Sequence, residues 1–163
     1  MKTIIKNIIS FILPGIVLII VPFYIEPDIS IKQTFALVTG LLLLCIGLFI
    51  MTLTISLFIR IGKGTLAPWS PTKKLVINGI YGHVRNPMIS GVLIVLTGES
   101  IAILSLNIFI WALIFFIINN LYFVIYEEPN LEKRFGNDYK EYKKNVPRWI
   151  PRLKPFVPDS ELK

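Results

Sequence analysis

One stretch of the chain decides its fold. Residues 88–125 read MISGVLIVLTGESIAILSLNIFIWALIFFIINNLYFVI and contain a single charged side chain, Glu99. Because a helix needs about 20 apolar residues to cross a bilayer, a stretch of this length predicts two crossings. The turn signal Ser105-Leu106-Asn107 divides it into two predicted helices, at 88–104 and 108–126.

Two polar runs lie at the ends of this predicted hairpin. Tyr81-Gly82-His83-Val84-Arg85-Asn86-Pro87 precedes it, and Tyr126-Glu127-Glu128-Pro129 follows it. If the chain crosses the membrane and returns, both runs meet at one membrane face. Charged groups gathered at the mouth of an apolar bundle indicate a site.

Two more apolar segments come earlier, at 8–25 and 33–59. We interpret the first as a membrane helix, because no small-residue cleavage pattern of a signal peptide follows it, and Pro14 predicts a kink in it. The predicted fold is all-α, a polytopic membrane bundle of about four transmembrane helices in a single domain over 1–163. The spans are 8–25, 33–59, 88–104 and 108–126, followed by a cytoplasmic helical tail over 127–163.

Basic residues predict the orientation of this integral, multi-pass protein. The loop over 60–85 contains five basic residues and no acid, and the tail after Glu128 is rich in Lys and Arg. Positive charge beside membrane helices marks the cytoplasmic side. We therefore expect the loop, the tail and both termini in the cytoplasm, with the segment 26–32 outside.

The charge and the residue counts limit the kinds of partner that we expect for this protein. The net charge is +7, but the basic residues flank membrane segments and form no single stripe, so we expect the lipid bilayer as a partner and no nucleic acid. One cysteine, Cys45, and one histidine, His83, exclude an internal disulfide and argue against a metal site. The sequence leaves the oligomeric state open.

The tail contains a helical pattern. Leu131, Phe135 and Tyr142 recur near helical spacing, and Gly136 predicts a division into two short helices. Trp149 and Phe156, beside prolines and basic residues, predict a segment that lies on the membrane surface.

The polar runs carry the candidate chemistry. Arg85 and the free backbone donors of the helix that begins at Pro87 suit an anionic group, although Arg85 alone would also suit a lipid phosphate. Glu127 and Glu128 lie at the predicted C-terminal end of a helix, where the dipole disfavours acids. Compensation could come from Arg85, from a cationic ligand with an amino or sulfonium group, or from solvent. Glu99 is either functional or turned toward the nearby outer surface.

The same residues resemble a known superfamily. Gly79-Ile80-Tyr81, Val84-Arg85-Asn86-Pro87-Met88 and Gly91 resemble the Gly-x-Tyr, Arg-His-Pro and Gly core of the isoprenylcysteine carboxyl methyltransferases and phospholipid methyltransferases. The C-terminal signature of the carboxyl methyltransferase branch is similar to Glu127-Glu128, Leu131, Phe135-Gly136, Tyr139, Tyr142 and Val146-Pro147-Arg148. The resemblance covers about residues 73–151.

The resemblance implies a membrane enzyme that uses S-adenosyl-L-methionine. It places the cofactor between the loop before the hairpin, the start of the third helix and the first acid. The implied cofactor contacts are Lys74, Leu75, Val76, Tyr81, Asn86, Pro87, Met88, Ile89 and Glu127, with Leu75 and Val76 at the adenine. Arg85 or Arg148 would orient an acceptor carboxylate, whereas Glu128 would take the proton of an acceptor amine.

Three departures from the family pattern leave the acceptor open. Asn86 replaces the family His, Ile89 replaces a Tyr, and Phe123 replaces an Arg of the carboxyl methyltransferase branch. We expect an S-adenosylmethionine-dependent methyltransferase for a lipid-like or prenylated amphiphilic substrate, similar to the isoprenylcysteine enzymes. The alternatives are a phospholipid amine N-methyltransferase, an NADPH-dependent membrane reductase of related architecture, and a non-catalytic membrane adaptor.

Overall fold

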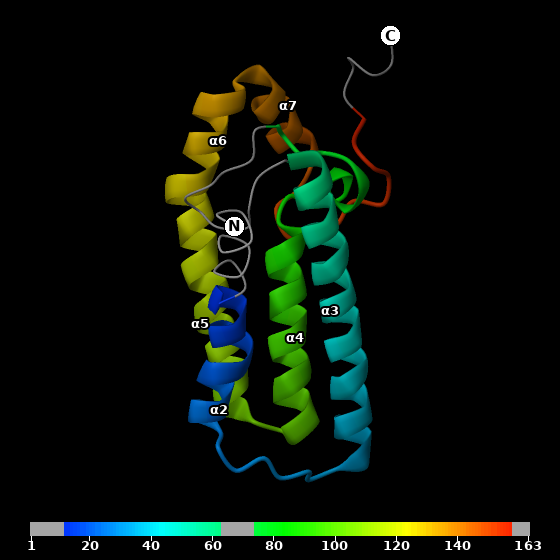
Figure 1. Cartoon of the computed structure of the whole chain (residues 1–163), viewed down its shortest axis with the longest axis vertical. Helices are drawn as coiled ribbons and strands as arrows, with labels where there is room; N and C mark the ends of the chain where they lie inside the picture. Colours follow the sequence, from blue (N-terminus) through cyan, green and yellow to red (C-terminus); the bar gives the residue numbers. More distant parts are fainter. Residues whose placement is uncertain (1–11, 63–73, 158–163) are drawn as a thin grey trace, which may run out of the picture.

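A computed structural model describes residues 12–62 and 74–157 of the chain. These residues form helices and no strand, so the all-α prediction is confirmed for them (Figure 1). The elements are η1 (Ile16–Ile20), α2 (Val21–Ile25), α3 (Thr34–Gly62), η2 (Gly79–Gly82), α4 (Pro87–Ile103), α5 (Leu106–Tyr122), η3 (Phe123–Glu127), α6 (Glu128–Phe135) and α7 (Asn137–Asn145).

Two of the described helices are long and apolar enough to cross a membrane, at Thr34–Leu57 and Leu106–Phe135. Two shorter apolar helices occupy Ile12–Ile25 and Pro87–Ile103. The described helices overlap the four predicted spans, of which residues 8–11 lie outside the described part of the chain, and a count of four crossings stays a prediction.

The α4–α5 hairpin turns at the predicted position. Leu104 has a left-handed backbone (φ 51°), and Ser105 caps α5 by accepting a hydrogen bond from the Ile108 amide at 3.3 Å. The Ser105 hydroxyl donates in turn to Glu26 Oε2 at 2.6 Å. This bond fixes the end of the first helix against the hairpin.

Glycines allow α3 and α4 to lie against each other along their length (Figure 1). A Cβ atom added at Gly40 would lie 2.5 Å from the Gly98 carbonyl oxygen, and one at Gly47 would lie 2.8 Å from that of Gly91. Each helix repeats its glycine after seven residues, so both glycines of a helix lie on the same face. Small residues of this kind let the backbones of membrane helices approach closely.

Adding one methyl group at this contact is expected to destabilise the protein. Gly40→Ala should lower the unfolding free energy by about 2 kcal/mol, because the new Cβ overlaps backbone atoms of α4 that cannot rotate away. Thermal unfolding in detergent measures the effect. Gly15→Ala is the matched control, since a Cβ there has no atom within 4 Å; an equal loss of stability in both variants would contradict the close contact.

Two prolines each widen the helical turn before them. The Glu128 amide donates to the Phe123 carbonyl across five residues ahead of Pro129, and the Val21 amide does the same to Ile16 ahead of Pro22. Proline lacks an amide hydrogen and crowds the carbonyl four residues earlier, so a wide turn relieves the conflict without ending the helix. In the described part of the first helix, a distortion therefore precedes Pro22. The turn before Pro14 extends outside the described residues, so the kink expected there stays a prediction.

The wide turn before Pro129 corrects a second expectation. The helix that begins at Leu106 continues through the acid pair to Phe135. Glu127 and Glu128 therefore lie inside a long helical run, and the prediction that they occupy an unfavourable C-terminal helix end was wrong. Stabilisation of these two charges therefore has to come from neighbouring side chains.

The tail folds back over the loop that precedes α4. Gly136, with a positive φ of 58°, separates α6 from α7, as predicted. Tyr139, Tyr142 and Val146 form a small core, against which residues of the loop, of α6 and of the C-terminal segment pack, namely Leu75, Ile77, Leu131, Phe135 and Phe156. Figure 1 shows α6 and α7 at the end of the bundle where α4 begins.

Candidate functional site

Glu128 is the centre of an ion cluster that joins three parts of the chain. Its Oε1 accepts from Arg85 Nη1 at 2.9 Å and from Arg148 Nε at 2.8 Å, and Lys143 Nζ lies 3.0 Å from Oε2. The side chains of Arg85 and Glu128 are 10% and 6% exposed. Of the compensating groups that the sequence left open, Arg85 pairs with one acid, and that acid is Glu128.

Backbone hydrogen bonds also join the segment before α4 to the segment after α7. The Arg85 amide donates to the Pro147 carbonyl at 3.0 Å, the Arg152 amide to His83 at 3.0 Å, and the Phe156 amide to Gly82 at 2.9 Å. The His83 ring Nδ1 lies 2.7 Å from the Arg152 carbonyl oxygen. Two segments without regular structure therefore satisfy each other's polar groups, as buried backbone requires.

The two acids differ in charge environment, although both lie past Tyr126, where the apolar part of the helix ends. Burial alone would raise the pKa of Glu128, but the Lys143 hydrogen bond and the charges of Arg85 and Arg148 lower it below its usual value. For Glu127, burial and then the charge of Glu128 raise the pKa to about 7. Among the described residues no ion pair holds Glu127, so this acid is the one that lacks a cation.

Tyr81 lies close to Glu127. Burial, followed by the negative charge of Glu127, raises the pKa of the Tyr81 phenol. The Tyr81 carbonyl accepts from the Tyr142 hydroxyl at 2.7 Å, which fixes the loop to α7. Two of the residues assigned to the cofactor are thus brought together by the tail.

The start of α4 offers free hydrogen-bond donors. Asn86 is the N-cap residue, but its side chain makes no capping bond, and Pro87 follows it as the first helical residue. The first amides of a helix have no partner within it. Beside them, Arg85 Nε is buried without a hydrogen-bond partner among the described groups.

The other residues assigned to the cofactor fall into two groups. Met88 and Ile89 are half-buried in the first turn of α4. Lys74 is exposed, Val76 is buried, and Leu75 packs against the tyrosines of the tail. The structure therefore gathers Tyr81, Asn86, Pro87 and Glu127 at one end of the bundle, whereas the proposed adenine contacts, Leu75 and Val76, belong to the packing of the loop.

An apolar cavity of about 510 Å³ adjoins this end of α4. Its walls come from α3, α4, α5, the loop and the tail, and include Ile50, Pro87, Leu93, Ile94, Phe116 and Trp149. Pro87 belongs to this wall and to the helix start that carries the free donors. The polar start of α4 and the apolar cavity are therefore adjacent at Pro87.

Two contributors to the site, Asn120 and Lys143, were not predicted from the sequence. Asn120, inside the apolar part of α5, accepts from Arg148 Nη1 at 2.9 Å and from Trp149 Nε1 at 3.1 Å. Lys143 completes the cluster around Glu128. The available signal was Asn119-Asn120, a polar pair in an otherwise apolar span, because polar groups in a membrane helix need partners.

The two aromatic rings of the tail segment pack against the protein. The Trp149 ring packs on Phe116 and Phe123, with centroid distances of 5.0 and 6.0 Å, and Phe156 packs on Tyr142 at 6.0 Å. These rings therefore hold the segment to the protein, and its position on the membrane surface stays a prediction. Phe123, where the family branch has an Arg, is part of this aromatic packing.

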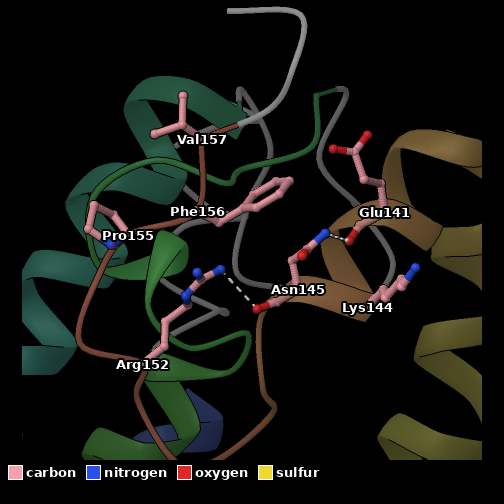
Figure 2. Close-up of a pocket in the computed structure, with 7 residues that line it drawn as sticks. All are labelled: Glu141, Lys144, Asn145, Arg152, Pro155, Phe156 and Val157. Carbon is pink, nitrogen blue, oxygen red and sulfur yellow. Dashed lines mark hydrogen bonds between the residues drawn. The ribbon is translucent and has the colours of Figure 1, made fainter. Parts of the chain in front are cut away.

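A second, more polar cavity of about 500 Å³ lies on the tail itself (Figure 2). Residues that line it are Glu141, Lys144, Asn145, Arg152, Pro155, Phe156 and Val157. Arg152 Nη1 donates to the Asn145 carbonyl at 3.0 Å, so this guanidinium is turned toward α7 (Figure 2).

Fold and site together define a class, an all-helical membrane protein with a charged cluster at one end of an apolar bundle. A family model described as phospholipid methyltransferase matches residues 35–138, more than half of the chain. The chain belongs to the phospholipid methyltransferase family, and its activity is that of a methyltransferase. No curated protein and no solved structure matches it significantly.

Proposed function

We propose that this protein transfers the methyl group of S-adenosylmethionine to a lipid-like or prenylated acceptor. The observation that carries the proposal is the contrast between the two acids. Glu128 is neutralised by three cations, whereas Glu127 is half-buried beside Tyr81 with no ion-pair partner among the described residues. An acid in this position suits a cationic ligand.

The residues at the end of the bundle fit the cofactor's polar groups. Glu127 would hold its ammonium group, and the free amides of α4 with the Asn86 amide would hold its carboxylate. When bound, the cofactor supplies an activated methyl group. The contribution of the protein is alignment and the exclusion of water, for which the closed contact between the loop and the tail is suited.

The acceptor's apolar chain would lie in the 510 Å³ cavity, with its reacting group near Pro87. The unpartnered Arg85 Nε favours an acceptor carboxylate, as in a prenylcysteine. A phospholipid amine is the second candidate, favoured by the description of the family. For an amine, Glu128 would be a poor proton acceptor, because its neighbouring cations lower its pKa, and Glu127 would already be paired with the ammonium group of the cofactor.

Binding tests separate methyl transfer from the alternative of nicotinamide-dependent reduction. We expect S-adenosylhomocysteine to raise the thermal stability of the detergent-solubilised protein in a concentration-dependent way, and NADPH to have no effect. Stabilisation by NADPH alone would contradict the proposal. No response to either ligand would favour a non-catalytic adaptor.

The proposed topology has four crossings, with both termini and the ion cluster on the cytoplasmic side. The predominance of basic residues in the loop and the tail supports it. A reporter that works only in the cytoplasm should be active when it is fused after Lys163. Activity of a reporter that works only in the periplasm or lumen would show the opposite orientation.

Cofactor affinity should depend on pH through Glu127. The ionised acid binds the ammonium group, so affinity should rise as pH rises through about 7 and fall below it. Between pH 8 and pH 6 the ionised fraction falls from about nine-tenths to about one-tenth, which predicts roughly tenfold weaker binding at pH 6. Calorimetric titration with S-adenosylhomocysteine measures this change; an equally steep dependence in Glu127→Gln would assign it to another group.

A further inference from the structure

The tail segment over 149–153 has a reversed distribution of polar and apolar side chains. Arg152 is turned toward α7 and donates to the Asn145 carbonyl (Figure 2). Ile150 and Leu153 point away from the protein and are 79% and 98% exposed. A segment in water would show the opposite pattern, because large apolar side chains gain most from burial.

The segment begins at the depth of the apolar helices. Trp149 donates to Asn120 and packs on Phe116, which lies one turn further from the ion cluster. Asn120 precedes Glu128 by eight residues, which is about 12 Å along a helix. The side chains of α5 around Asn120 are themselves apolar and exposed, with Ile117, Ile118 and Leu121 each more than half exposed.

Part of the backbone of the segment is satisfied within the protein. Irregular backbone is stable at membrane depth only where its polar groups are satisfied within the protein. The Arg152 amide bonds to His83 and the Arg152 carbonyl lies 2.7 Å from the His83 ring. Pro151 and Pro155 have no amide hydrogen to satisfy.

We propose that Ile150 and Leu153 are inserted in the acyl region of the bilayer, in the leaflet next to the Arg85–Glu128 cluster. The segment 149–153 is then a lipid-embedded strap, held to the protein by Trp149 and Arg152. Lys154, which is exposed directly after Leu153, extends to the lipid phosphates. Insertion of this segment into the bilayer does not depend on which acceptor the protein methylates.

Site-directed spin labelling of the full-length protein tests the strap. Cys45, the single cysteine, is exposed and can be replaced by alanine, after which cysteine is introduced at Leu153 or Ile150. Leu113, exposed in the middle of α5, gives the lipid reference, and Lys140, exposed on α7, gives the water reference. Each labelled variant is placed in phosphatidylcholine nanodiscs, and collisions with oxygen and with a water-soluble nickel chelate are compared.

We expect labels at 153 and 150 to resemble the label at 113, with frequent oxygen collisions and protection from nickel. Nickel accessibility equal to that at 140 would overturn the proposal. Protection from both reagents would also overturn it, because a protein partner or a second copy would then cover this surface. Both positions are exposed, so labelling removes little packing and leaves the fold intact.

Discussion

Replacing Glu128 with glutamine is expected to lower the unfolding free energy by about 3–5 kcal/mol, the usual cost of breaking a buried ion pair from one side. The carboxylate is the shared partner of Arg85, Arg148 and Lys143, and its loss leaves three cations next to each other. The tail should then separate from the loop. Activity should fall together with stability.

The matched control is Glu132→Gln, in the same short helix. Among the described residues Glu132 pairs with Lys143 alone, on a part of the surface where the lysine is 38% exposed, so its loss should cost less than about 1 kcal/mol. Thermal or denaturant unfolding in detergent compares the two variants. Equal effects would show that the cluster around Glu128 does not hold the tail.

Replacing Glu127 with glutamine is expected to have the opposite profile, a large loss of cofactor binding with little loss of stability. A hydrogen bond to a charged group contributes about 1.5–3 kcal/mol, which corresponds to a roughly 10–100-fold weaker affinity for S-adenosylhomocysteine. Because no ion pair among the described residues depends on Glu127, the fold should tolerate the change. Calorimetric titration and thermal unfolding of the same preparation measure both effects.

Glu141→Gln provides the control for a change of charge alone. Glu141 is exposed on α7, and its side chain is not part of the cluster. Its replacement should leave the affinity unchanged. If Glu127→Gln bound S-adenosylhomocysteine as tightly as the unchanged protein, the cofactor would have to lie elsewhere.

The helices could be predicted from the sequence because their lengths and turn signals are local. The break at Ser105 and the division at Gly136 both depend on residues at the turn itself. The continuation of the helix past Pro129 could not be predicted in this way, since it depends on a widened turn. The close contact of α3 and α4 was also missed, because a seven-residue glycine spacing has meaning only when the partner helix is known.

The site could be predicted in part. The hairpin topology alone brings Arg85 near the acid pair. The widened turn sets the directions in which the two acids point, so that Glu128, and not Glu127, forms the ion pair with Arg85. Asn120, Lys143 and Trp149 join the site through the folding of the tail, which is a tertiary contact between distant segments. Residue patterns within one segment carry little information about such contacts.

The most direct test of methyl transfer is an assay with S-adenosylmethionine that carries a labelled methyl group. The purified protein is given prenylcysteine analogues and a phospholipid extract in parallel, with Glu127→Gln at subsaturating S-adenosylmethionine as the control with weakened cofactor binding. We predict label in an extractable lipid-like product that depends on the unchanged protein, and base-labile label if the acceptor is a carboxylate. Tight binding of S-adenosylhomocysteine without label in either class of acceptor would contradict the account.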